Sequence, residues 1–187
     1  FWGAEGYYQL GDFDGATYTP GDGILRYNWG GHAYAAQTYS DMCATDGRRI
    51  QIAWMRTTMP GMPFNGCMTF PCELSLRTTP QGIRLFSQPV REIETLHRRR
   101  HYWEDLALPA GGMALDGVGG ELFDIRATIA PGTASQVGLT VLGVPVIYDV
   151  ASATLSCEGR SAPLPLVDGA IKVQILVDRT SVEIFGN

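Results

Sequence analysis

Two carboxylates stand close together near the start of the sequence, in the stretch Gly11-Asp12-Phe13-Asp14-Gly15. On a β-strand, residues two apart point to the same face and lie about 7 Å apart. A pair of carboxylates on one face is an arrangement that general acid–base chemistry can use. Aspartates beside glycines are also ordinary turn residues, because their side chains hydrogen-bond to the nearby backbone. Asp12 and Asp14 are therefore a conceivable reactive pair, and a turn at the end of a hairpin is the favoured interpretation.

Histidine and cysteine, the other common sources of reactive or metal-binding side chains, form no recognisable cluster. His32 stands alone in a glycine-containing loop, which is typical of a solvated side chain. The spacings contain no C-x-x-C pair, so we expect neither a zinc site nor a redox site, and no cofactor. An odd separation would place Cys67 and Cys72 on opposite faces of one strand, which argues against a bridge. Buried free thiols are expected at all four cysteines: Cys43, Cys67, Cys72 and Cys157.

Short strands must position these side chains, because the first half of the sequence has no convincing helical period. Turn-forming residues such as Pro20-Gly21-Asp22-Gly23 recur at short intervals and separate short apolar or alternating runs. This pattern predicts an all-β fold. The strands predicted in the first half span residues 6–10, 15–19, 24–27, 33–39, 49–55, 67–76 and 82–86.

Residues 90–106 differ in character from what precedes them. Val90, Ile93 and Leu96 have the spacing of a short helical turn, and an arginine run follows at 98–100. A domain boundary is therefore predicted here. The chain would divide into a first domain, a connector and a second domain at residues 1–90, 91–106 and 107–187.

The second domain again shows strand patterns. The stretch 121–129 alternates apolar and polar residues, which gives one buried face and one solvated face. Further strands are expected at 137–142, 146–149 and 153–157. The final pair of runs, 172–177 and 180–185, is interpreted as one long strand broken at Asp178-Arg179. Together these strands predict a β-sandwich.

Charge and composition restrict the partners. A net charge of −5 argues against a nucleic-acid partner. No stretch approaches the roughly 18 apolar residues of a membrane-spanning helix, so no membrane partner is expected. No secretory signal is visible. Because the sequence opens inside an apolar run at Phe1, that absence leaves a secreted or periplasmic location open. The final Gly186-Asn187 should begin a tight turn, so we expect a piece that is incomplete at both ends.

Five ordered stretches go beyond a generic β-protein: Gly11–Gly15, Tyr34–Tyr39, Arg49–Met55, Met68–Leu76 and Val177–Asn187. Together, and in this order, they resemble glycoside hydrolase family 32, the β-fructosidases that include invertases, inulinases and levanases. The family pattern is roughly G-D-F-D-G, F-Y-A-A-Q-T-F, R-I-x-I-G-W-M, M-T-x-P-R-E-L and D-R-S-S-V-E-V-F. The resemblance covers essentially the whole chain.

The resemblance implies the last part of a five-bladed β-propeller followed by a C-terminal β-sandwich. Residues 1–90 would be the end of the catalytic propeller domain, and 107–187 the sandwich. Blades without their neighbours expose raw strand edges, which invite aggregation. The chain is therefore expected to need the N-terminal part of the propeller, either as a companion chain or as the missing part of a longer one.

The resemblance assigns no catalytic residue to this sequence. Retaining hydrolysis of a glycosidic bond uses two carboxyl groups about 5–5.5 Å apart. In the resembled family these groups lie in W-M-N-D-P-N-G, R-D-P and E-C motifs, upstream of the part matched here. The sequence contains no N-D-P, R-D-P or E-C. Glu73 follows Cys72, where the family has arginine, and a structural role is favoured for it.

Substrate-binding residues can be carried over in part. The resemblance implies that Trp54 helps to wall a sugar pocket, since an indole suits the C–H face of a furanose ring. A core tryptophan is the alternative. Tyr34 and Gln37 would line the same pocket from the neighbouring strand. The family usually shows D-Y-G-x-D-F-Y-A, whereas this chain has Asn28 and His32 at the two acidic places. Polar substrate contacts at those places are therefore in doubt.

Three hypotheses follow. The chain is the C-terminal portion of a retaining β-fructosidase that acts on sucrose or on a fructan such as levan or inulin, and is inactive by itself. Alternatively, it is a non-catalytic fructan-binding module. As a third possibility, it is a structural or oligomerising β-module held in a complex with the front half. The sequence does not distinguish levan, inulin and sucrose.

Overall fold

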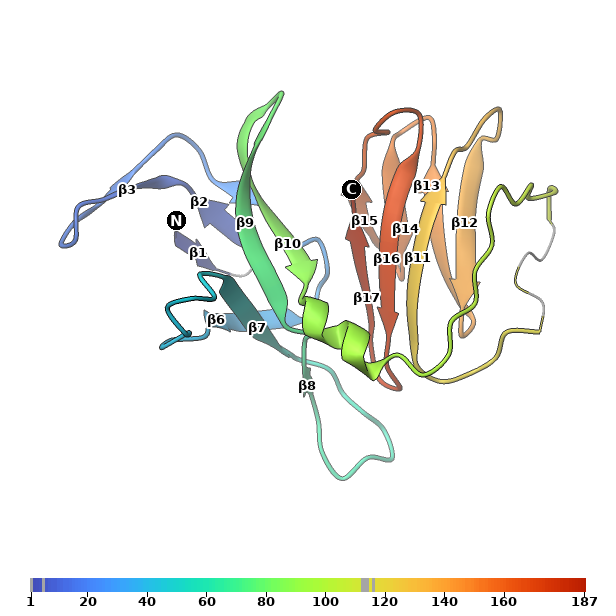
Figure 1. Cartoon of the computed structure of the whole chain (residues 1–187), viewed down its shortest axis with the longest axis horizontal. Helices are drawn as coiled ribbons and strands as arrows, with labels where there is room; N and C mark the ends of the chain where they lie inside the picture. Colours follow the sequence, from blue (N-terminus) through green and yellow to red (C-terminus); the bar gives the residue numbers. More distant parts are fainter. Residues whose placement is uncertain (1, 5, 112–114, 116) are drawn as a thin grey trace.

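Two β-regions lie side by side in the computed structural model, which describes residues 2–4, 6–111, 115 and 117–187. Figure 1 shows the first region on the left and the second on the right, joined by the short 3-10 helix η1 (Arg91–Leu96). Strands dominate both regions. Among the described residues, none of the helical structure is long and apolar enough to cross a membrane.

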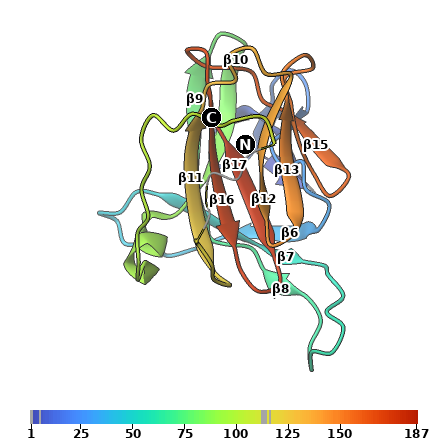
Figure 2. The same ribbon diagram turned by 90° about the vertical axis from the view of Figure 1, so that its right-hand side faces the viewer.

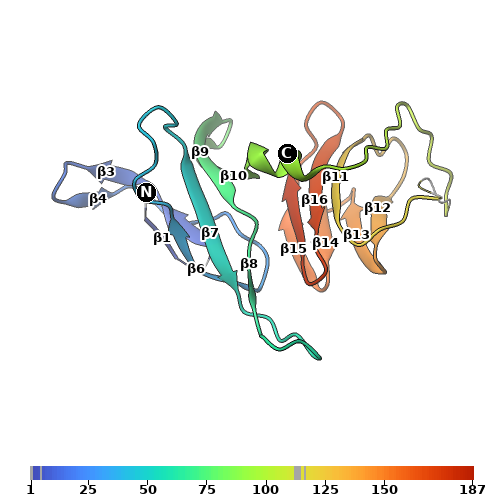
Figure 3. The ribbon, with the colours of Figure 1, turned by 60° about the horizontal axis from the view of Figure 1, so that its bottom comes forward.

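The main sheet of the first region is an antiparallel meander with the strand order β10-β9-β7-β6. Four antiparallel strands that follow one another in the chain make up a propeller blade. The two-stranded extension β7–β8 continues beyond the blade into the loop 56–66, which projects away from the body of the molecule in Figures 1 and 3. The strands are β6 (Ala33–Thr38), β7 (Arg49–Met55), β8 (Cys67–Met68), β9 (Cys72–Thr79) and β10 (Gly82–Pro89).

A smaller sheet covers one face of this blade. Its buried Tyr8 packs against Leu74 of β9 and Leu85 of β10. The Tyr8 hydroxyl also accepts a 3.1 Å hydrogen bond from the Leu85 backbone N–H. The two sheets therefore stack like neighbouring blades. The strands involved are β1 (Trp2–Ala4), β2 (Tyr7–Gln9) and β5 (Leu25–Arg26), with a separate hairpin of β3 (Gly11–Phe13) and β4 (Tyr18–Pro20).

The second region is a sandwich of two antiparallel sheets, which lie next to each other in the view of Figure 2. Alternate residues of β16 point inward, so that Ile171, Val173 and Ile175 are buried against the opposite sheet. Tyr148 of β13 fills the same interior and is fully buried. One sheet contains β11 (Phe123–Ile129), β16 (Ile171–Val177) and β17 (Val182–Gly186), and the other β12 (Gln136–Val141), β13 (Val144–Asp149), β14 (Thr154–Cys157) and β15 (Arg160–Pro163).

An apolar cluster joins the two regions. Ile50 of β7 packs with Val90 and Ile93 next to and within η1, and with Leu176 of the sandwich. Arg48 fixes η1 to the blade, since its guanidinium donates hydrogen bonds to both Asp46 and Glu92 at distances from 2.6 to 3.0 Å. The connector and the sandwich are thus held against the blade by apolar burial and by a charged clamp.

The prediction of one continuous strand over 67–76 is wrong, because the strand is interrupted between β8 and β9. Pro71 has no N–H to donate to a neighbouring strand. The Phe70 N–H donates instead to Glu183 of the sandwich, at 2.8 Å. The domain contact therefore takes the place of the sheet ladder at this point.

The prediction of one long strand across 172–185 is also wrong. β16 and β17 form an antiparallel hairpin in which Val177 pairs with Val182. Asp178 N–H donates to the Ser181 carbonyl at 2.9 Å, which closes the turn. Alternation continues through both strands, so periodicity alone does not reveal the reversal.

Three smaller expectations need correction. Gly11–Phe13 was expected as a turn and forms β3, and β15 was not predicted. All four cysteines are free, as expected, but only Cys72 is buried. Burial raises the pKa of the Cys72 thiol to about 12, which makes it an inert core residue.

Candidate functional site

A row of three side chains crosses one face of the blade. Tyr34 on β6 is paired with Trp54 on β7, which is paired in turn with Met68 on β8. Directly paired residues in an antiparallel sheet share a face. The Tyr34 and Trp54 rings meet edge to face, with centroids 6.4 Å apart. Trp54 is 45% exposed and Met68 52%. We call this exposed side of the blade the Trp54 face.

A β-bulge brings Gln37 to the same face. The separation of three residues between Tyr34 and Gln37 would place them on opposite sides of a regular strand. The register shifts between them, with Ala35 at a φ of 48°, and Gln37 pairs with Ile52. Because Ile52 and Trp54 are two apart on β7, Gln37 joins the Trp54 face. The structure therefore brings Tyr34, Gln37 and Trp54 to one face, while their binding role stays a prediction.

Arg56 supplies a positive charge beside these rings. Its guanidinium lies over the Tyr34 ring, 4.1 Å from the centroid. The Arg56 N–H donates to the His32 carbonyl at 2.9 Å, and the His32 Nδ1 lies 3.3 Å from the Arg56 carbonyl oxygen. His32 is thus tied to the strand that carries Trp54, although the sequence suggested only a solvated loop residue.

Gly66 allows the chain to pass directly over the indole. It has a φ of 73°, and a Cβ placed there would lie 2.5 Å from Trp54 Nε1 and 2.9 Å from the Met55 carbonyl oxygen. Any larger residue would therefore displace the tryptophan. Sequence reasoning missed Arg56, Gly66 and Met68. Arg56 could have been found from the sequence, because a residue two positions after Trp54 on a strand points to the same face. Gly66 and Met68 could not, because their contact with Trp54 depends on how β7 pairs with β8.

The candidate carboxylates do not gather at this face. Asp14 Oδ1 accepts hydrogen bonds from the N–H groups of Ala16 and Thr17 at 2.8 and 2.7 Å. These bonds lower the pKa of Asp14, with the one from Thr17 contributing most. Asp14 is therefore a turn residue, as favoured from the sequence. Asp12 is exposed on β3.

Glu73 lines a polar cleft between the blade and the sandwich. The cleft has a volume of about 320 Å³, and Arg77, Gln88 and Gln174 also line it. Arg77 Nη2 donates to Gln88 Oε1 at 2.7 Å. Glu73 is half-buried there rather than in the blade interior, so this carboxylate stays near solvent and near arginines.

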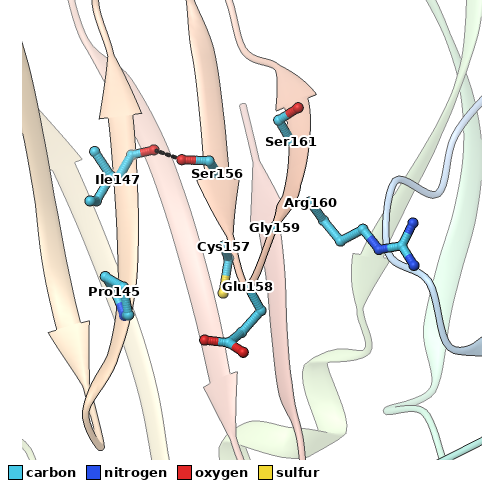
Figure 4. A pocket seen from close by; sticks show the side chains of 8 residues that line it. All are labelled: Pro145, Ile147, Ser156, Cys157, Glu158, Gly159, Arg160 and Ser161. Carbon is cyan, nitrogen blue, oxygen red and sulfur yellow. Dashed lines mark hydrogen bonds between the residues drawn. The ribbon is translucent and has the colours of Figure 1, made fainter.

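A second hollow, of about 370 Å³, lies on the outer surface of the sandwich. Figure 4 shows the Ser156 hydroxyl turned to the Ile147 carbonyl, to which it donates at 3.2 Å. The Arg160 side chain extends away from the other lining residues. A Cβ at Gly31 of the blade region would lie 2.5 Å from Arg160 Nη2, so this arginine touches the loop before β6. The hollow contains no aromatic side chain among its lining residues.

Glu183 is a carboxyl of the domain junction whose pKa is raised. Burial raises the pKa of Glu183 to about 7, and the hydrogen bond from the Phe70 N–H only partly offsets it. The residue belongs to the Asp178–Phe185 stretch and anchors the sandwich on the segment between β8 and β9. Its place at the junction indicates a role in holding the two regions together.

No group of three or more histidine, cysteine, aspartate or glutamate side chains within the described ranges could hold a metal ion. The Trp54 face itself offers an indole, a phenol, an amide and a guanidinium. Apolar ring surfaces with a few hydrogen-bonding groups are typical of ligand sites. This face can bind a polyhydroxylated ligand, but it has no carboxylate pair for acid–base chemistry among the residues described above.

Two family models match the chain in consecutive order. Residues 3–89 match the model described as "Glycosyl hydrolases family 32 N-terminal domain". Residues 92–187 match the model described as "Glycosyl hydrolases family 32 C terminal".

Sequence relatives agree with these matches. A levanase from Bacillus subtilis (strain 168) is 32% identical over 212 residues, which cover 96% of this chain and 31% of that protein. An extracellular exo-inulinase from Aspergillus awamori is 27% identical, over 96% of this chain and 40% of that protein. A raffinose invertase from Escherichia coli is 29% identical, over 86% of this chain and 35% of that protein. The chain thus spans well under half the length of these relatives.

A solved structure supports the fold. The crystal structure of exo-inulinase from Aspergillus awamori superposes with a TM-score of 0.76 at 23% identity, and covers 96% of this chain and 42% of that one. The fold class predicted from the sequence, the last part of a β-propeller followed by a β-sandwich, is confirmed.

Proposed function

Because the chain belongs to glycoside hydrolase family 32, we propose that it is the C-terminal portion of an enzyme that hydrolyses β-fructosides. The substrate would be sucrose or a fructan such as levan or inulin. The observation that carries this proposal is the pair of consecutive family-model matches, which together account for nearly the whole chain. The named relatives are a levanase, an exo-inulinase and an invertase.

The domain organisation of the chain forms part of this proposal. Residues 1–90 would be the end of the catalytic propeller, 91–106 the connector and 107–187 the sandwich. The separate blade and sandwich cores support this division, since each has its own apolar cluster. The charged clamp of Arg48 on Glu92 supports a connector that is fixed rather than free.

The Trp54 face would form one wall of the sugar site. Trp54 offers an apolar surface to the C–H face of a fructose ring. Arg56 and Gln37 lie beside it and offer N–H donors to sugar hydroxyl groups. Tyr34 holds Arg56 over its ring and so positions that donor. These residues would bind and orient the substrate, and no proton-transfer step is assigned to them.

The catalytic carboxyl groups would come from a part of the protein outside these 187 residues. Retaining hydrolysis needs a nucleophile and an acid/base about 5–5.5 Å apart. Asp14 is engaged in its turn, and Glu73 lies in the cleft between the regions. The chain alone is therefore expected to be inert, and a companion segment carrying the upstream propeller would complete the site.

A non-catalytic fructan-binding module is the second candidate. The exposed Trp54 favours it, because an aromatic wall can bind saccharide without any carboxylate. Both candidates predict binding, and they differ in whether an upstream segment restores hydrolysis.

Affinity electrophoresis in gels that contain levan or inulin tests the shared binding step. Wild-type protein should be retarded, and Trp54→Ala should migrate as in a gel without polysaccharide. Trp103→Ala is the matched control, since Trp103 is similarly exposed, at 42%, but lies on the connector. Equal retardation of the wild type and Trp54→Ala would remove the Trp54 face from the proposal. Hydrolysis upon addition of the upstream propeller segment would favour the enzyme over the binding module.

A further inference from the structure

One arginine of the sandwich reaches across to the blade region. Arg160 begins β15, directly after the turn Glu158-Gly159 that joins it to β14. Both turn residues have a positive φ, 46° and 70°, which is the conformation of a tight type I′ hairpin turn. In Figure 4 the Arg160 side chain leaves the hollow and extends toward a ribbon segment of the blade region. A short hairpin with a defined turn therefore presents this side chain to the blade.

The guanidinium group of Arg160 lies with its face on the backbone at Gly31. A Cβ built on Gly31 would lie 2.5 Å from Nη2, 2.7 Å from Cζ and 2.9 Å from Nε. Because three atoms of the group lie at similar distances, its flat face rather than one N–H meets the glycine. A planar, weakly hydrated guanidinium is suited to such face-on packing. The contact also requires glycine at this position.

The segment that Arg160 covers is weakly held between two well-tied ends. On one side, the Tyr27 and Asn28 N–H groups donate to the Gly6 carbonyl at 2.9 and 3.2 Å. The Gly30 N–H donates to Asn28 Oδ1 at 2.9 Å. Gly31 forms no backbone hydrogen bond with another described residue outside the strands. Two adjacent glycines have the largest conformational freedom, so the Arg160 face restrains the part of the loop that most needs it.

The other end of this loop leads directly to the Trp54 face. The His32 carbonyl accepts the Arg56 N–H at 2.9 Å, and the His32 Nδ1 lies 3.3 Å from the Arg56 carbonyl oxygen. The Arg56 guanidinium in turn lies over the Tyr34 ring. Any movement of Gly31 is passed to the adjacent His32, and from there to the backbone that carries Arg56.

We propose that Arg160 is a positioning residue for the sugar site, which holds Gly31 and His32 in place and thereby fixes Arg56 on the Trp54 face. This role rests on the saccharide-binding function proposed above for that face. Arg160 acts through the loop and does not itself touch the ligand. The sandwich would thus influence binding through one side chain, in addition to its packing at the domain junction.

The simpler account is that Arg160 only helps to attach the sandwich to the blade. An attachment role would lower the stability of the whole protein when the side chain is removed. A positioning role instead loosens the loop and weakens binding, while the sandwich core stays as it is. Local hydrogen exchange separates the two, because each amide reports the opening of its own segment.

Hydrogen–deuterium exchange of the full chain, resolved to single amides by NMR, is the first readout. In Arg160→Ala the Arg56 amide should exchange about fivefold faster or more, because the loop that carries its acceptor loses a backbone restraint. Amides of β16 in the sandwich core should exchange as in the wild type. Arg179→Ala is the matched control, since Arg179 pairs with Glu121 within the sandwich. It should leave the Arg56 amide unchanged.

Arg160→Lys is a milder second variant, which keeps the charge and the aliphatic stem but lacks the flat guanidinium face. It should also speed exchange of the Arg56 amide. This result stands even if Arg160→Ala proves poorly folded.

Affinity electrophoresis in levan or inulin is the second readout. Arg160→Ala should be retarded less than the wild type, and Arg179→Ala equally. The proposal is overturned if the Arg56 amide keeps its protection in both Arg160 variants, if β16 loosens to the same extent as the loop, or if a retarded wild type and Arg160→Ala migrate alike. A wild type that is not retarded at all would instead count against the proposed saccharide binding, and the exchange of the Arg56 amide would still decide whether Arg160 positions it.

Discussion

The blade and the sandwich bury their sheets in different ways. In the sandwich, two sheets cover each other, and Tyr148, Ile171 and Ile175 are at most 1% exposed. In the blade, β2 covers one face through Tyr8, while the other face leaves Trp54 and Met68 about half exposed. The closed core between its two sheets makes the sandwich a support, whereas a sheet with an exposed aromatic face is available to a ligand or to a neighbouring blade.

This difference indicates how the sandwich contributes. It touches the blade through Leu176 on Ile50 and through Glu183 on the Phe70 N–H. Phe70 directly follows the short β8 segment that pairs with Trp54. The sandwich therefore packs on the Ile50 end of β7 and on the segment that borders the exposed Trp54.

The largest effect should come from opening the sandwich core. Ile175→Ala should lower the free energy of unfolding by about 2–5 kcal/mol, because it leaves a cavity at a fully buried position. Phe13→Ala, at a 66% exposed position of the β3–β4 hairpin, should change it by less than about 0.5 kcal/mol. Urea denaturation monitored by circular dichroism measures both. Equal losses would contradict the description of the sandwich as the supporting region.

The junction between the regions should respond to pH through Glu183. Its pKa is raised from 4.5 to about 7 in the folded protein, so the folded state keeps a proton that the unfolded state releases. The free energy of unfolding should therefore be highest below about pH 4.5 and fall as the pH rises to about 7, by up to roughly 3 kcal/mol from this group.

Glu183→Gln isolates this contribution. The amide keeps an acceptor for the Phe70 N–H and cannot ionise. Urea denaturation at intervals between pH 4.5 and 8 should show a weaker pH dependence for the variant than for the wild type, and higher stability of the variant at pH 8. Parallel curves would show that burial at the junction does not control the ionisation of Glu183.

Each region has a buried tyrosine, Tyr8 in the blade region and Tyr148 in the sandwich, and removing the two hydroxyl groups compares the stability of the two regions directly. Tyr8→Phe removes the acceptor of the Leu85 N–H and should cost about 1–3 kcal/mol, because that buried N–H loses its partner. The Tyr148 hydroxyl has no hydrogen-bond partner among the described residues. Tyr148→Phe should therefore be neutral or stabilising. Thermal unfolding of the two variants side by side checks the contrast, and a larger loss for Tyr148→Phe would reverse it.

The smallest effect is expected at the contact of Arg160 with the loop before β6. Gly31→Ala would place a methyl group against the guanidinium, which is the flexible end of a long side chain and can move away. The free energy of unfolding should change by less than about 0.5 kcal/mol. A loss above 1 kcal/mol in denaturant titrations would show that this contact, and not only the β17 hairpin, fixes the sandwich on the blade.

Much of the fold was accessible from local patterns. The strands 33–39 and 49–55 correspond closely to β6 and β7, because apolar residues and turns mark them in the sequence. The reversal at Asp178-Arg179 was not accessible, since both arms keep the same alternation. The break at Phe70-Pro71 had a local signal in the proline, which donates no N–H to a neighbouring strand. The hydrogen bond from the Phe70 N–H to Glu183 had none, because the two residues are 113 apart in sequence.

The candidate site was predictable only in part. The family resemblance pointed to Trp54, Tyr34 and Gln37, and the structure brings them to one face. Their position on one face depends on a bulge at Ala35, where the backbone has a positive φ without the glycine that usually marks such a position in a sequence. Arg56 was not predicted as a site residue, because a charged residue at this position is also what an ordinary solvent-facing strand position would show. Side-chain partnerships of this kind are set by register, which a sequence pattern specifies weakly.

The most direct test of the central claim is fructose release from levan, inulin and sucrose by the purified chain, with denaturing intact mass confirming that no other polypeptide is present. No release above the protein-free control is predicted, because the proposed function assigns the catalytic carboxyl pair to a part of the protein outside these residues. Release by the wild type that is lost in Asp12→Asn or Asp14→Asn would contradict it, since the reaction would then use carboxylates of this chain.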